Sequence, residues 1–118
     1  MNQQEYQQLM SELKYYQELL EQVEASLMNL KKTKEDLEEF EKEKGNQVLA
    51  PIANGVYVEA EIKNKDLFVN VGSDVVCKKS VSEAIQIIDN QQKEVLEDQN
   101  KIIQKIEECY SLLQNKGD

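Results

Sequence analysis

Apolar residues recur every three or four positions along the first third of the chain. Nine of the ten positions that this spacing defines are apolar: Tyr6, Leu9, Leu13, Tyr16, Leu20, Val23, Leu27, Leu30, Lys34 and Leu37. A sustained 3.5-residue repeat is the period of a left-handed coiled coil. Nothing from Asn2 to Lys44 breaks a helix, and Gly45 is placed to end it. We predict one long helix, and because its apolar stripe is narrow, the helix needs a partner.

The same repeat returns at Val81. Its positions are Val81, Ile85, Ile88, Gln92, Val95, Gln99, Ile102, Ile106, Cys109 and Leu113. Ser80 or Ser82 can cap the start of this second helix. The two glutamines either fix the register between the helices or mark a locally hydrated stretch, and the spacing does not distinguish these two interpretations. Two helices with matching stripes predict an antiparallel hairpin, in which Cys109 packs as a small apolar side chain.

The two predicted helices differ in length by about nine residues. If they start level beside the middle of the chain, Tyr6, Leu9 and Met10 lie beyond the end of the second helix. Apolar side chains without an intramolecular partner mark an interaction site. A frayed terminus or a slightly shifted register is the alternative interpretation.

Residues 46–80 lose the helical period and alternate as strands do. We predict strands at 47–52, 56–62, 67–71 and 75–79, with turns between them at Asn54-Gly55, 63–66 and Gly72-Ser73-Asp74. These segments form two β-hairpins. So few strands have little core and open edges, so we expect the edges to pair with other subunits in a shared barrel, although the hairpins could instead fold back on their own helices.

Composition narrows the function. The 118 residues carry a net charge of −9 and contain neither histidine nor arginine. Residues 1–45 carry −5, residues 46–80 carry zero and residues 81–118 carry −4. Such a chain lacks the usual general base and the usual metal ligand, and its acidity disfavours nucleic acid. We therefore expect no enzyme activity, no metal and no cofactor. No apolar run is long enough to cross a membrane and no signal peptide is evident, so a cytoplasmic protein is expected.

The central stretch resembles the alpha-class subunits of the prefoldin family. The resemblance rests on the segments Val48-Leu49-Ala50-Pro51-Ile52, Gly55-Val56-Tyr57-Val58-Glu59-Ala60, Val69-Asn70-Val71-Gly72, Val76-Cys77-Lys78-Lys79 and Glu83-Ala84. The order of helix, two hairpins and helix agrees with it, whereas Cys77 departs from the β-branched residue that is more usual there. The resemblance implies an α+β fold: one prefoldin domain over 1–118, with coiled-coil helices at 1–45 and 81–118 and assembly hairpins at 46–80.

The resemblance also implies a mechanism. Prefoldin is a hexamer of two alpha and four beta subunits whose hairpins form a double barrel. Its coiled-coil tips capture unfolded clients and deliver them to a group II chaperonin without ATP. The implied barrel residues are Val48, Leu49, Ile52, Val56, Val58, Ile62, Leu67, Val69, Val71 and Val76. The implied client-binding residues are Tyr6, Leu9, Met10, Leu13, Tyr110, Leu112 and Leu113. The alternatives are a structural coiled-coil scaffold, including a filament-forming relative without client transfer, or an adaptor subunit of another complex.

Overall fold

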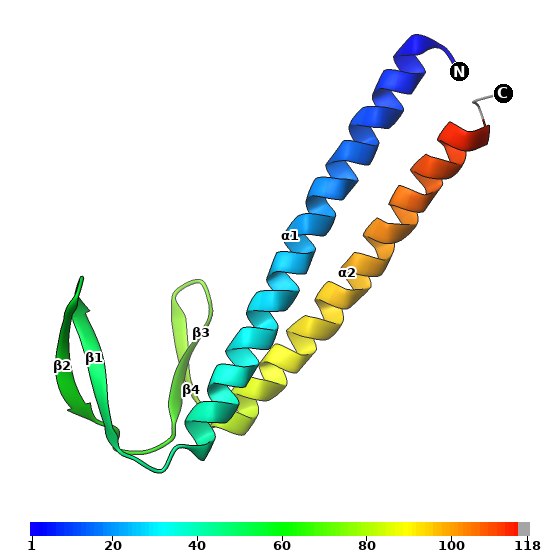
Figure 1. Cartoon of the computed structure of the whole chain (residues 1–118). Helices are drawn as coiled ribbons and strands as arrows, with labels where there is room; N and C mark the ends of the chain where they lie inside the picture. Colours follow the sequence, from blue (N-terminus) through cyan, green and yellow to red (C-terminus); the bar gives the residue numbers. More distant parts are fainter. Residues whose placement is uncertain (116–118) are drawn as a thin grey trace. The chain divides into compact units, whose positions relative to one another are not determined.

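The computed structural model describes residues 1–115 and contains two long helices separated by four strands (Figure 1). The elements are α1 (Gln3–Lys42), β1 (Gln47–Ala53), β2 (Val56–Glu61), β3 (Leu67–Gly72), β4 (Val75–Lys79) and α2 (Val81–Asn115). The chain divides into two compact units. We call residues 1–32 with 89–115 the helical unit and residues 33–88 the hairpin unit.

The two helices bury the positions that the heptad spacing predicts. Every predicted stripe position in α1 is buried or half-buried except Tyr6, and every one in α2 is buried or half-buried. Within the helical unit the two helices lie side by side and run in opposite directions (Figure 1). Neither helix in the described residues is long and apolar enough to cross a membrane. The predicted pairing of two apolar stripes is therefore confirmed in this unit.

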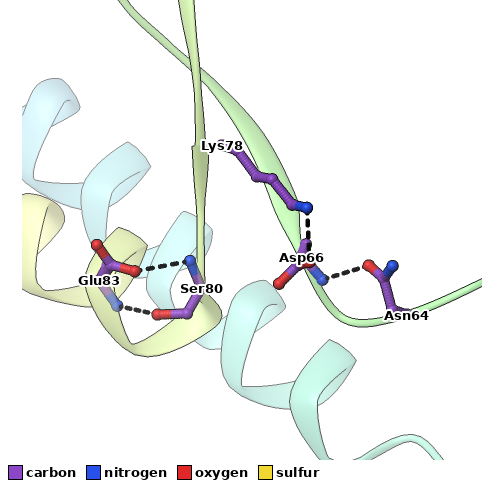
Figure 2. Close-up of polar contacts among 5 residues, drawn as sticks. All are labelled: Asn64, Asp66, Lys78, Ser80 and Glu83. Carbon is purple, nitrogen blue, oxygen red and sulfur yellow. Dashed lines mark hydrogen bonds and ion pairs between the residues drawn. The ribbon is translucent and has the colours of Figure 1, made fainter.

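Side chains cap the starts of both helices. At α1, the Glu5 N–H donates to Asn2 Oδ1 at 2.7 Å. At α2, Ser80 and Glu83 form a reciprocal pair, in which the Glu83 N–H donates to Ser80 Oγ at 3.1 Å and the Ser80 N–H donates to Glu83 Oε1 at 3.2 Å (Figure 2). This capping box satisfies two amide groups that a helix start leaves without partners. Of the two serines that the sequence offered, Ser80 is the cap.

The end of α1 differs from the prediction. The helix ends at Lys42, and Gly45 does not have the positive φ of a glycine that ends a helix. Instead, the Lys65 Nζ donates to the backbone carbonyls of Phe40 at 2.8 Å and Glu43 at 3.0 Å. A cation suits this position because the last carbonyls of a helix carry partial negative charge. The prediction that Gly45 ends the helix is therefore wrong. Lys65, which lies more than 20 positions later in the sequence, binds the carbonyls at the end of α1.

The four strands form two separate antiparallel pairs, β1 with β2 and β3 with β4. Their bounds agree with the predicted strands to within one residue. In the first pair Val48 faces Ala60 and Ala50 faces Val58, and the register shifts between Pro51 and Ala53. In the second pair Val69 faces Cys77 and Asn70 faces Val76, and the register shifts between Asn70 and Gly72. Both predicted β-hairpins are confirmed.

The two hairpin turns use different backbone conformations. Gly55 has a φ of 76° in the first turn, where the preceding Asn54 keeps a negative φ. In the second turn Ser73 and Asp74 have φ values of 50° and 61°. Two consecutive residues with positive φ define a type I′ turn, which matches the twist of a β-hairpin. This conformation is unfavourable for a serine, so the second turn is strained.

Candidate functional site

A small apolar core closes the end of the helical unit. Leu9, Leu13 and Cys109 are buried there, and Tyr16, Ile106 and Leu113 pack against them. We call this end, formed by residues 1–17 and 106–115, the tip. Its core joins the first turns of α1 to the last turns of α2, so the two helices are packed together at this end.

The packing of the tip contradicts the prediction that the first helix extends about nine residues beyond the second. The helices have 40 and 35 residues, a smaller difference than the nine residues expected. Leu9 is only 7% exposed and packs with α2, so it does not lie beyond its partner. Leu13 is equally enclosed at 5%. The two leucines therefore support the tip from inside and offer little surface to a binding partner.

Four of the predicted client-binding side chains are exposed on the outside of this core: Tyr6, Met10, Tyr110 and Leu112. The remaining one of the seven, Leu113, is half-buried against the core. Tyr110 is held in place by Gln17, whose Nε2 donates to the tyrosine Oη at 3.2 Å. Large apolar side chains on a rigid support form a surface that can cover apolar groups of another molecule.

Cys109 lies in the core of the tip and is 4% exposed. Burial raises the pKa of its thiol, and the carboxylates of Glu12 and Glu108 raise that pKa further. A thiol is nucleophilic only as the thiolate, so this environment keeps Cys109 unreactive. Its role is that of a small apolar side chain, as the sequence suggested. Among residues 1–115, no three acidic or thiol groups are placed to hold a metal ion.

The first hairpin exposes apolar side chains on both faces. Val48, Ala50, Val58 and Ala60 share one face, because opposite residues in an antiparallel pair point to the same side. The other face carries Leu49 with Tyr57 and Glu59. Leu49 is 65% exposed and Ile52 is 67% exposed. The predicted barrel residues of this hairpin therefore belong to both of its faces.

The second hairpin has one half-buried face and one exposed face. Leu67, Val69 and Cys77 share a half-buried face. Val76 lies on the opposite face with Phe68, which is 74% exposed. Phe68 and Tyr57 are not among the predicted barrel residues, although a large aromatic residue at a polar position of an alternating strand is a signal that could have identified them. Phe68 and Val76 therefore leave apolar surface exposed on this face of the hairpin.

The linker between the hairpins is tied down by polar contacts on both sides. Lys65 binds the end of α1, and its ammonium also lies 4.2 Å from the centre of the Phe40 ring. The Asp66 N–H donates to Asn64 Oδ1 at 2.9 Å, and the Asp66 carboxylate lies 3.2 Å from Lys78 Nζ on β4 (Figure 2). The linker is thus connected to α1 and to the second hairpin, which orients the hairpin within its unit.

A helical hairpin with two β-hairpins between its helices defines an α+β coiled-coil subunit, and most of its exposed large apolar side chains lie at the tip and on the strands. The family model of the prefoldin subunit matches residues 9–116. This chain belongs to the prefoldin family and groups with its alpha-class subunits. The predicted family and fold class are therefore confirmed.

Two curated relatives and one solved structure illustrate the similarity. The prefoldin subunit alpha of Archaeoglobus fulgidus is 32% identical, over 93% of this chain and 87% of its own. The prefoldin subunit alpha of Thermofilum pendens is 30% identical, over 88% and 82%. A chain of filamentous PFD from Methanocaldococcus jannaschii aligns with a TM-score of 0.78 over 92% of both chains. Its identity of 18% supports the shared fold alone.

Proposed function

We propose that the chain is a subunit of an ATP-independent chaperone that captures unfolded proteins with its tip and delivers them to a group II chaperonin in the cytoplasm. One observation carries this proposal: Tyr6, Met10, Tyr110 and Leu112 are exposed on a tip whose own core is already closed. Because the core does not need these side chains, their apolar surface is available to a client. Their action is binding, without catalysis.

The burial of the tip revises the set of client-binding residues. Tyr6, Met10, Tyr110 and Leu112 make the contacts in this proposal, and half-buried Leu113 contributes its edge. Leu9 and Leu13 position them from inside, since each is nine-tenths buried or more. Aromatic and thioether side chains suit varied clients because they bury large areas and adapt to different shapes.

In this proposal the two β-hairpins bind the other subunits of the complex. Two alpha-class and four beta-class subunits join their strands in a shared platform. The contacts are the predicted set Val48, Leu49, Ile52, Val56, Val58, Ile62, Leu67, Val69, Val71 and Val76, extended by Tyr57 and Phe68. The exposed apolar area on both faces of the first hairpin supports this, because a two-stranded sheet with open edges is not stable alone. Several weak tips on one platform then hold a client by avidity.

A structural, filament-forming role is the second candidate. The observation in its favour is that the solved structure with the same fold is described as filamentous. A filament uses the same hairpin contacts but does not need exposed apolar side chains at the tip. Electron microscopy of the assembled complex distinguishes a closed particle from a growing polymer.

An aggregation assay tests the chaperone role. The assembled complex is mixed with a chemically denatured enzyme, and light scattering is followed after dilution. The tip variant replaces Tyr6, Met10 and Leu112 with serine. The matched control replaces Met28, Leu96 and Ile103, which are large, exposed side chains on the helical unit outside the tip. We expect the wild type and the control to suppress aggregation and the tip variant to lose most of this effect; a tip variant as effective as the control overturns the proposal.

A further inference from the structure

Leu112 lies between two surface hollows of the tip. One hollow, of about 220 Å³, is lined by Met1, Glu5, Gln8, Leu9, Glu12 and Leu112. The other, of about 610 Å³, is lined by Gln104, Glu107, Glu108, Ser111 and Leu112. Leu112 is the residue common to both, and 47% of its surface is exposed. A large apolar side chain of a partner can therefore approach Leu112 from either side.

The surroundings of Leu112 are acidic. Glu5 and Glu12 lie one above the other on α1, since seven residues make two helical turns, and Glu12 lines the same hollow as Leu112. Glu108 approaches from α2 and lines the other hollow. Glu12 belongs to α1 and Glu108 to α2, and each lines a hollow that Leu112 also lines. The two hollows are lined by four carboxylates, those of Glu5, Glu12, Glu107 and Glu108, and by one cationic residue, the N-terminal Met1. Lys105 adds a second cation 3.6 Å from Glu108, so negative charge remains in excess around Leu112.

The other flank of the tip is more nearly balanced in charge, because Lys14 follows Met10 by about one turn on α1 and Glu107 precedes Tyr110 by about one turn on α2. It carries Tyr110 with Gln17, which are joined by a hydrogen bond between neutral groups. Met10 lies two helical turns before Gln17 on the same side of α1. The two flanks thus present apolar side chains in different electrostatic surroundings. Their binding preferences can therefore be compared within one molecule.

We propose that the flank around Leu112 selects client segments in which a large apolar side chain lies within a few residues of lysine or arginine. The inference rests on the proposed function, because it assigns a client class to the same tip. An apolar side chain of the segment covers Leu112, and its cationic neighbours approach Glu5, Glu12 and Glu108. Acidic segments are repelled by the same carboxylates. Exposed ion pairs are individually weak, so the expected preference is about fivefold in affinity and is lost at high salt.

Three labelled peptides test the selectivity on the assembled complex. Each has the same leucine and phenylalanine positions, and the intervening residues are lysine in one, serine in the second and glutamate in the third. Fluorescence anisotropy gives each dissociation constant at low salt and again at about 0.5 M salt, where charges more than a few ångströms apart are screened. We expect the lysine peptide to bind most tightly and the glutamate peptide least tightly, with the three values converging at high salt.

Matched variants assign the preference to this flank. Changing Glu5→Gln, Glu12→Gln and Glu108→Gln together should bring the lysine and glutamate peptides closer in affinity while the serine peptide is unaffected. The control changes Glu18→Gln, Glu21→Gln and Glu97→Gln, which are exposed on the same two helices but line neither hollow. An unchanged ratio in the first variant, or an equal change in the control, overturns the inference. Binding of the serine peptide separately supports the chaperone role, and failure to bind any of the three overturns both proposals.

Discussion

Replacing Lys65 with methionine removes one ammonium group and leaves most of the aliphatic stem in place. In the structure this ammonium donates two hydrogen bonds, to the carbonyls of Phe40 and Glu43, at 2.8 and 3.0 Å. It also lies over the Phe40 ring. These contacts join the linker between the hairpins to the end of α1, so their loss affects the whole hairpin unit.

The magnitude follows from the type and exposure of the contacts. A hydrogen bond from a charged donor contributes about 1.5 kcal/mol net, and a partly exposed cation–π contact contributes about 0.5–1 kcal/mol. Lys65 is half-buried, and its bond to Glu43 is on the surface, so solvent reduces the sum. We expect the free energy of unfolding to fall by about 2 kcal/mol. With a urea m-value of about 1.5 kcal/mol per M, the unfolding midpoint falls by about 1.3 M.

Urea unfolding, followed by circular dichroism, measures this change. All variants are compared at one subunit concentration, because association contributes to the apparent stability. Lys63→Met is the matched control: it removes an exposed lysine from the same linker and should shift the free energy by less than about 0.5 kcal/mol. A double-mutant cycle of Lys65→Met with Phe40→Leu should give a coupling energy of about 0.5–1 kcal/mol. If Lys65→Met and Lys63→Met unfold at the same urea concentration, Lys65 does not hold the end of α1.

Four further predictions concern the capping box, the strained turn and the core of the tip. Ser80→Ala should lower the unfolding free energy by about 1 kcal/mol in urea titrations, and Ser82→Ala should have little effect. The hydrogen bonds from Ser80 lower the pKa of the Glu83 carboxyl group. The ionised carboxylate therefore stabilises the fold at a pH above the ordinary glutamate pKa, and this stabilisation is lost as the pH falls through the lowered pKa. Glu83→Gln should consequently make the melting temperature less dependent on pH in the acid range. Ser73→Gly should raise stability by about 0.5–1 kcal/mol, because glycine adopts the positive φ without strain, and an unchanged melting temperature contradicts this reading. Leu13→Ala should cost about 2–4 kcal/mol because it leaves a cavity beside Cys109, whereas exposed Met10→Ala should cost less than about 0.5 kcal/mol; equal losses would place Met10 in the core.

The elements that depend on local periodicity were predictable from the sequence. The heptad spacing identified the stripes of both helices, because each turn of a helix repeats its own contact pattern. Only Tyr6 among the stripe positions is exposed, since it lies in the first turn of α1, before the core of the tip begins at Leu9. Strand alternation and turn residues located the hairpins for the same reason. A serine cap for α2 was also predictable, although the sequence left Ser80 and Ser82 as alternatives and only the structure selects Ser80.

Contacts between distant residues were not predictable. Lys65 reaches Phe40 across 25 positions, and no local pattern connects a linker lysine to a helix end. The burial of Leu9 depends on how far one helix slides along the other, which the spacing of apolar residues leaves undetermined. The faces of Leu49 and Val76 depend on strand register and on two register shifts, and a shift of one residue exchanges the faces. Phe68 and Tyr57 were passed over because the alternation assigned their positions to the polar face.

Site-specific photo-crosslinking tests the central claim, that the tip of this chain holds the client, most directly. A photoreactive amino acid replaces Met10 at the tip or, as a control, Met28, which is 73% exposed on the helical unit away from the tip core. Each assembled complex is mixed with a denatured, labelled enzyme and irradiated. We predict a crosslinked product from position 10 and little or none from position 28. Equal crosslinking at both positions, or crosslinking at position 28 alone, would contradict client capture by the tip.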